Sequence, residues 1–173
     1  VLQSQAGQSA QDKQQSMQAA IQAHYLAVVA LGRARQAELN RQLDRAVPLI
    51  ATGHLTTVGA SSNDAVREIY VGSLEAYPTN AFPASDYIAL GHIHKAQKVG
   101  GLDHIRYCGS PIPLGFDEAR QQKEVLLVDL GAGGLSAVTP LTVPRFQPLL
   151  SVNGNLLELA TAISEAAAES AAR

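Results

Sequence analysis

The sequence contains no tryptophan, one cysteine and few aromatic residues. Phe, Trp and Tyr together make up 5% of the 173 residues, so the core has to be built mainly from aliphatic side chains. The single cysteine, Cys108, excludes a disulfide within these residues and is typical of a protein from a reducing compartment. Because Cys108 lies in an apolar run, we expect a buried, inert thiol in a cytoplasmic protein.

Long apolar runs and a strong excess of charge are also missing. No run of 18 apolar residues and no charged-then-apolar leader is present, so neither a membrane span nor a signal peptide is predicted. The formal net charge is −2, which excludes a domain-wide basic field for binding nucleic acid. Any contact with DNA therefore has to be local, or to be supplied by a metal or a partner. The chain opens on Val1 and Leu2 without a methionine, which we interpret as part of a longer protein.

Hydrophobic patterning predicts helices first, then buried strands, then hairpins. Buried parallel strands read as continuous apolar runs, whereas hairpins are separated by short glycine-rich turns. This order indicates an α/β fold with layered sheets. The predicted elements are helical segments at 12–31 and 33–46 interrupted at Gly32, buried strands at 49–52 and 87–90, a loop at 55–63, and hairpins at 96–108 and 124–143.

The character of the chain changes after Pro144. A strand at 146–152, a turn at 153–155 and an alanine-rich helix at 156–172 are predicted there. We interpret residues 145–173 as the start of a second, capping domain that follows a main domain at 1–144. The alternative is a carboxyl-terminal helix that docks on the main domain.

Histidines follow both predicted buried strands. His92 and His94 end the segment Gly-His-Ile-His, and in an extended backbone residues two apart point the same way. His54 follows a glycine at the end of the earlier strand. A single His-x-His is a weak signal, but the carboxyl ends of strands are where open α/β sheets bind ligands. The three histidines therefore predict a metal site, and neutral imidazole suits zinc, iron, manganese and copper alike.

Other residues that could act in catalysis or metal binding have simpler interpretations. Ser110 lies in a stiff loop with two prolines and is expected to form a wall of the cleft, because the strand-turn-helix setting of a nucleophile is missing. Asp117 and Glu118 have side chains that could bind a metal on composition alone, but nothing in their spacing supports that role. His24 is interpreted as a surface or packing residue of a helix, and His104 as a solvated residue of a turn.

Three segments resemble one known family. Residues 50–60 contain Thr-Gly-His, residues 86–97 contain Leu-Gly-His-Ile-His-Lys, and residues 106–114 read Arg-Tyr-Cys-Gly-Ser-Pro-Ile-Pro-Leu. In these segments the chain resembles the SbcD family of nuclease subunits, which are calcineurin-like metallophosphoesterases. The resemblance is strong over 48–118 and looser as far as residue 148.

The resemblance implies a layered α/β/β/α sandwich of which this chain contains the second half. Members of the family have five metal-binding motifs, and the Gly-His and Gly-His-x-His motifs map onto His54 and onto His92 with His94. By this resemblance His54 and His92 bind one manganese ion and His94 binds another. The first three motifs, Asp-x-His, Gly-Asp and Gly-Asn-His-Asp, do not occur in the chain, so the two-metal site is only partly encoded and no catalytic residue is assigned.

The resemblance also implies an activity and partners. Such proteins assemble with an SbcC-type ATPase of the structural-maintenance class, degrade double-stranded DNA ends in the 3′–5′ direction and open DNA hairpins during recombination, replication and repair. We expect a hetero-oligomer that binds DNA and no membrane. Since neutral imidazoles cannot offset the repulsion between two nearby cations, the chain by itself is expected to be inactive. Two alternatives are a non-catalytic interaction module with a degenerate metal site and a phosphodiesterase for small cyclic nucleotides.

Overall fold

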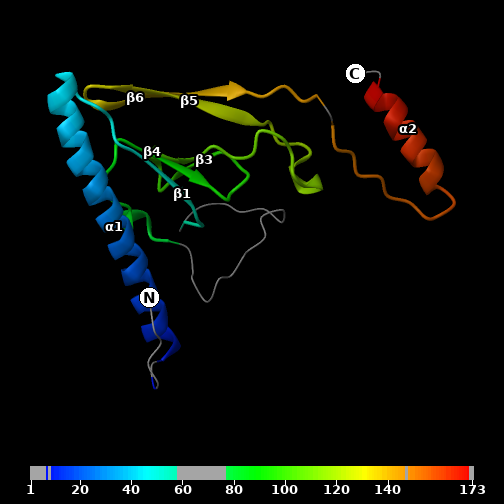
Figure 1. Cartoon of the computed structure of the whole chain (residues 1–173). Helices are drawn as coiled ribbons and strands as arrows, with labels where there is room; N and C mark the ends of the chain where they lie inside the picture. The colour runs from blue at the N-terminus through cyan, green and yellow to red at the C-terminus, as the bar shows by residue number, and fades with distance from the viewer. Residues whose placement is uncertain (1–6, 8, 58–76, 147, 172–173) are drawn as a thin grey trace.

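The structure, a computed structural model, describes residues 7, 9–57, 77–146 and 148–171 and consists of two sheets and two long helices (Figure 1). Most of the predicted loop at 55–63 lies outside the described residues. The elements, in chain order, are α1 (Ala10–Leu43), β1 (Ile50–His54), the 3₁₀ helix η1 (Thr79–Ala81), β2 (Tyr87–Gly91), β3 (Gln97–Val99), β4 (Leu102–Tyr107), the 3₁₀ helix η2 (Phe116–Glu118), β5 (Glu124–Gly131), β6 (Gly134–Thr142) and α2 (Leu159–Ala171).

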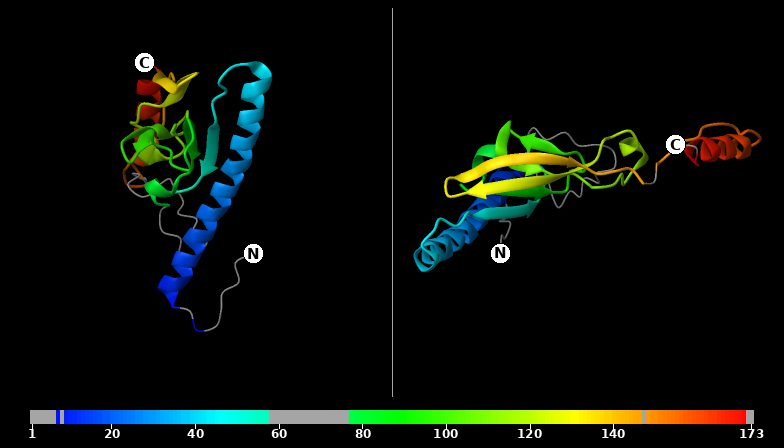
Figure 2. Two further views of the ribbon diagram at one scale, coloured as in Figure 1. Left: turned by 90° about the vertical axis from the view of Figure 1, so that its left-hand side faces the viewer. Right: turned by 90° about the horizontal axis from the view of Figure 1, so that it is seen from above.

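The larger sheet has the strand order β1-β2-β4-β3. β1 and β4 both run parallel to β2, and β3 is antiparallel to β4. β5 and β6 form a separate antiparallel ribbon that stacks over the larger sheet, while α1 runs beside β1 (Figures 1 and 2). The predicted α/β class is confirmed, and the arrangement is compatible with part of a metallophosphoesterase sandwich.

Helix α1 is continuous, so the predicted interruption at Gly32 is wrong. A capping box between Ser9 and Asp12 starts the helix, and Asp44 ends it with φ 47° and ψ 40°. A Cβ on Gly32 would lie 3.2 Å from Leu49 Cδ1. Gly32 is therefore explained by the close approach of the chain that leads into β1, and not by a break in the helix.

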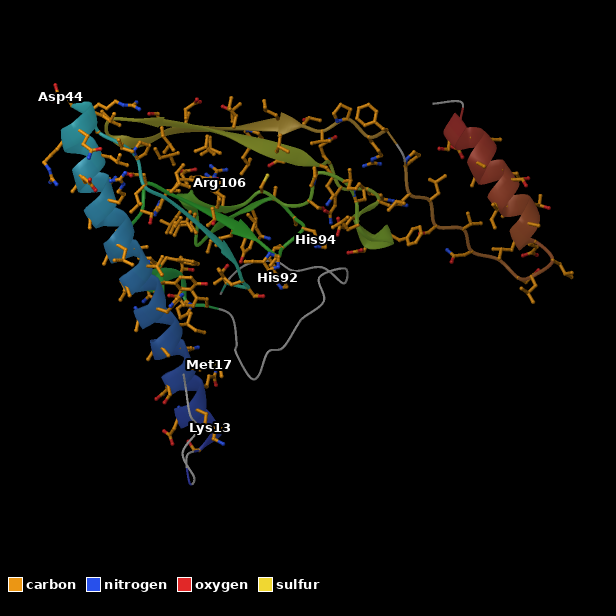
Figure 3. The ribbon with its side chains drawn as sticks, in the orientation of Figure 1. Lys13, Met17, Asp44, His92, His94 and Arg106 are labelled. Atoms are coloured by element: carbon orange, nitrogen blue, oxygen red, sulfur yellow. The ribbon has the colours of Figure 1, made fainter. Side chains whose placement is uncertain are left out.

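The amino-terminal turns of α1, with Lys13 and Met17, extend beyond the sheets (Figure 3). Hydrogen bonds attach the other half of the helix: Arg33 Nη2 donates to the carbonyl of Ala84 at 2.7 Å, and Gln36 Nε2 to that of Val47 at 2.6 Å. No helix among the described residues is both long and apolar enough to span a membrane.

The buried core lies around β2 and β4. The prediction of a buried strand without alternation is confirmed for β2, but the same prediction is wrong for the strand at 49–52. Exposure alternates along β1, and Ile50 is 52% exposed, because β1 lies at the edge of the described sheet. Both predicted hairpins are confirmed, as β3–β4 and β5–β6. The core cluster consists of Ile88, Leu90, Ile93, Val99, Ile105 and Tyr107.

The segment after Pro144 differs from its prediction. Its described residues form no strand at 146 or 148–152, so that prediction is wrong. The helix α2 begins at Leu159, and in the turn before it Asn155 Oδ1 accepts hydrogen bonds from the backbone N–H groups of Leu157 (2.9 Å) and Glu158 (3.1 Å). α2 lies apart from both sheets (Figures 1 and 2). The division between domains at residues 144 and 145 stays a prediction.

Candidate metal centre

The carboxyl ends of β1 and β2 bring two of the predicted histidines together. The parallel register pairs His54 with Gly91, so His92 is the next residue beyond the pair. The ring centroids of His54 and His92 are 5.2 Å apart, and the ring planes meet at 67°. Figure 3 shows His92 and His94 beyond the end of the sheet, at the edge where ligands of α/β sheets bind.

The glycine before His92 makes room for the other ring. A Cβ on Gly91 would lie 2.9 Å from His54 Nδ1, closer than a real side chain tolerates. Gly91 is therefore required by the space that the imidazole of His54 occupies.

The backbone leaves the extended conformation at His92. β2 ends at Gly91, and His92 has φ 99°, a value that residues other than glycine rarely adopt. Such conformations cost about 1–3 kcal/mol and occur at functional sites more often than elsewhere. The prediction that His92 and His94 project together from an extended backbone is therefore wrong, and the two rings contact different residues.

Electrostatics favours the metal-binding form of His92. Burial lowers the pKa of His92 below its usual 6.5, and the nearby His54 and His94 lower it further. A histidine binds a metal as the neutral imidazole. At pH 6.5, where an ordinary histidine is half protonated, the His92 ring is thus mostly in the form that accepts a cation.

His94 contacts a buried carboxylate. Its Nδ1 lies 2.8 Å from Glu118 Oε1, and the Glu118 side chain is fully buried. Lys123 Nζ lies 2.6 Å from Glu118 Oε2, and Ser110 Oγ donates to the same oxygen at 3.2 Å. Ser110 is therefore part of a buried polar cluster, and not only a wall of the cleft.

Asp117, His24 and Cys108, which the sequence analysis also discussed, take no part in these contacts. Asp117 is exposed, although it is the direct neighbour of Glu118. His24 is exposed on α1, where its ring lies 5.9 Å from that of Tyr25. Cys108 is partly buried, and its Sγ lies 3.8 Å from the carbonyl of Glu124.

The donor atoms fit part of a metal site. Within the described ranges, no three His, Cys, Asp or Glu side chains converge to hold one ion. His54 and His92 supply two imidazoles, which suit part of the coordination sphere of one divalent cation. They do not by themselves suit two manganese ions, because oxygen ligands are what manganese prefers. Metal binding by His54, His92 and His94 stays a prediction.

Sequence reasoning did not predict the roles of Glu118 and Lys123. The segment between Phe116 and Lys123 contains charged and amide side chains, a composition that is typical of a solvent-exposed turn. Lys123 directly precedes β5, and nothing in that position signals a buried lysine.

Known proteins with similar sequences include subunits of a nuclease. No family model matches the chain. The chain is 47% identical over 169 residues to a nuclease subunit of Escherichia coli strain K12. The aligned residues make up 95% of this chain and 40% of that protein. It is also 41% identical over 106 residues to a protein of Rhodobacter capsulatus (60% of this chain, 25% of that protein) and 32% identical over 103 residues to one of Bacillus subtilis (58% and 26%).

Each of these relatives is SbcD, one of the subunits of the nuclease SbcCD. The resemblance to the SbcD family that the sequence predicted is therefore confirmed. The chain spans 40% of the length of the Escherichia coli protein and about a quarter of the other two.

Proposed function

We propose that this chain supplies one edge of the metal centre of an SbcCD-type DNA nuclease. In this proposal His54 and His92 share one manganese ion, and His94 binds a second one. The observation that supports it best is the distance of 5.2 Å between the rings of His54 and His92 at the carboxyl ends of adjacent parallel strands. The similarity to the SbcD component of the nuclease SbcCD is the second support.

In this proposal each protein group has a separate role. A two-metal site activates a hydroxide and stabilises the attacking and leaving oxygens of phosphodiester hydrolysis. His54 and His92 would bind and orient one cation, and the low pKa of His92 keeps its ring in the neutral, binding form. His94 would bind through Nε2, because Glu118 already lies at Nδ1.

We also propose that these residues do not hydrolyse DNA without further ligands. Two close cations repel one another strongly unless an anionic ligand lies between them. The described residues provide no carboxylate next to the pair formed by His54 and His92. The anionic ligands would come from the Asp-x-His, Gly-Asp and Gly-Asn-His-Asp motifs, which the 173 residues do not contain.

Incubation of the 173-residue chain with manganese and two DNA substrates tests this proposal. The substrates are a linear duplex and a hairpin, each labelled at one end, and the His94→Ala variant is the control. We expect no cleavage by either protein. Manganese-dependent cleavage by the chain that disappears in His94→Ala would contradict the proposal of inactivity and would show a complete site.

Partners are proposed from the same similarity. The SbcCD relatives are subunits of a complex, so we propose that a protein with this chain assembles with an SbcC-type ATPase and binds DNA ends and hairpins. Degradation in the 3′–5′ direction, a role in recombination, replication and repair, and a cytoplasmic location are part of this proposal. Co-purification of the chain with an SbcC-type ATPase, compared with the ATPase alone on the same resin, measures the assembly.

A further inference from the structure

We propose that Glu118 is a positioning residue that holds His94 in the tautomer with Nδ1 protonated and Nε2 free to bind a divalent cation. Lys123 and Ser110 in turn fix Glu118. This inference rests on the proposed function, because it treats His94 as a metal ligand. It adds a set of buried residues that act through His94 without touching the cation.

The two oxygens of the Glu118 carboxylate contact different groups. Oε1 lies 2.8 Å from His94 Nδ1. Oε2 accepts hydrogen bonds from Lys123 Nζ at 2.6 Å, from Ser110 Oγ at 3.2 Å and from the backbone N–H of Leu114 at 3.2 Å. In these contacts Oε1 faces the histidine, and Oε2 accepts the three hydrogen bonds from the other donors.

The charge of Glu118 decides where the proton between Glu118 and His94 lies. A buried carboxyl group beside an ammonium group and two further donors is stabilised as the carboxylate, which only accepts hydrogen bonds. The group across from Oε1 must then donate, so Nδ1 of His94 has the proton. A neutral imidazole has one protonated nitrogen, and Nε2 consequently keeps its lone pair for a cation.

The same residues also hold the backbone of His94. Lys123 Nζ donates to the carbonyl of His94 at 3.1 Å, and the backbone N–H of Ser110 donates to that carbonyl at 3.1 Å. Lys123 Nζ further donates to Ser110 Oγ at 2.9 Å. Both the ring and the main chain of His94 are thus fixed by one cluster.

Stability alone gives little reason for this cluster. Glu118 is fully buried and Lys123 is 6% exposed, and a buried ion pair is rarely more stabilising than apolar side chains of the same volume. Carboxylates that orient a metal-binding histidine are a common arrangement, and their loss typically lowers metal affinity about 10–100-fold. The position of Glu118 behind His94 matches that arrangement.

The first experiment needs no change to Glu118. Multiple-bond ¹H–¹⁵N correlation spectra of the 173-residue chain, recorded at about pH 8, above the usual pKa of histidine, report which ring nitrogen is protonated. The signals of His94 are assigned by their loss in His94→Gln. We expect the tautomer with Nδ1 protonated. The opposite tautomer, with Nε2 protonated, would overturn the proposal even if every Glu118 variant failed to fold.

The second experiment replaces the hydrogen-bond acceptor beside His94 Nδ1 by a donor. In Glu118→Gln the amide oxygen should remain with the donors around Oε2, so the amide NH₂ should point to His94 Nδ1 and force the proton onto Nε2. We expect the tautomer to switch and the affinity for zinc, followed through the His94 signals, to fall about 10–100-fold. Asp117→Asn removes a neighbouring, exposed carboxylate and should leave the tautomer and the affinity unchanged.

The outcomes separate this inference from the proposed function. An unchanged tautomer and unchanged zinc affinity in Glu118→Gln would overturn the positioning role. Zinc that leaves the His94 signals of the unaltered chain unchanged would instead contradict the assignment of His94 as a ligand. The tautomer in the metal-free chain would still decide whether Glu118 orients the ring.

Discussion

Gly91 and His92 are neighbours with different functions at the end of β2. Gly91 leaves space for the His54 ring, and His92 ends the strand with φ 99° and contributes the second ring. The distance between the two imidazoles thus depends on a position that has no side chain of its own.

We expect Gly91→Ala to weaken metal binding. The added Cβ would lie 2.9 Å from His54 Nδ1, so the ring of His54 has to move away from His92. Isothermal titration with zinc should show an affinity reduced about tenfold or more. Gly133→Ala is the matched control, because no atom lies within 4 Å of its added Cβ. Equal affinities of the two variants would show that the ring position does not depend on Gly91.

A second expectation at this scale concerns the charge state of His92. Burial is the main cause of its low pKa, and the proximity of His54 is the next cause. In His54→Gln we expect the pKa of His92 to rise but to stay below 6.5, because burial remains. An NMR titration of the ring protons without metal measures this change. A pKa that stays the same or falls would contradict the coupling between the two rings.

At the scale of elements, Tyr107 connects the end of β4 to the segment after β1. Its side chain is fully buried, and its hydroxyl donates to the carbonyl of Leu55 at 2.6 Å and lies 3.3 Å from Thr57 Oγ1. Leu55 directly follows His54, so this contact fixes the strand end from which the candidate ligand projects.

We expect Tyr107→Phe to lower the free energy of unfolding by about 0.5–1.5 kcal/mol, the usual net value of one such hydrogen bond. Urea unfolding followed by circular dichroism measures the loss. Tyr25→Phe is the control for removal of a hydroxyl, because Tyr25 is less buried and its ring contacts His24 and Tyr77. A loss no larger than that of the control would show that the Tyr107 hydroxyl does not stabilise the end of β1.

Individual elements show how much of the fold the sequence could predict. The unbroken apolar run of β2 and the glycine turns of the two hairpins are local signals, and their predictions are confirmed. Gly32 and the segment at 146–152 were predicted wrongly, because the close approach of Leu49 and the packing partner of a strand are long-range properties.

Of the candidate site, the histidines could be predicted from the sequence, but the residues that hold them could not. Gly-His at two strand ends led to His54 and His92, which the structure brings together. The contact of His94 with Glu118 joins residues 24 positions apart, and a charged segment gives no sign of a buried carboxylate. Local patterns therefore located the rings, and only the fold located the groups that hold them.

At the scale of the whole molecule, packing is concentrated in the sheet. The core cluster lies on β2 and β4 and their connections, whereas α1 has no buried residue. An apolar hollow of about 350 Å³ lies between α1 and the strands β1 and β2, lined by side chains such as Val28, Leu49 and Ile88. His92 and His94 follow the well-packed strand β2, whereas His54 is exposed at the end of the edge strand β1.

Paramagnetic relaxation tests whether a cation binds between the ends of β1 and β2. Substoichiometric manganese is added to the ¹⁵N-labelled chain, and the broadening of every assigned signal is measured. We expect the signals of His54, His92 and their neighbours at the ends of β1 and β2 to broaden first, while those of α2, which lies apart from both sheets, stay sharp. Uniform broadening, or broadening that avoids the end of β2, would contradict a cation site between these two strands.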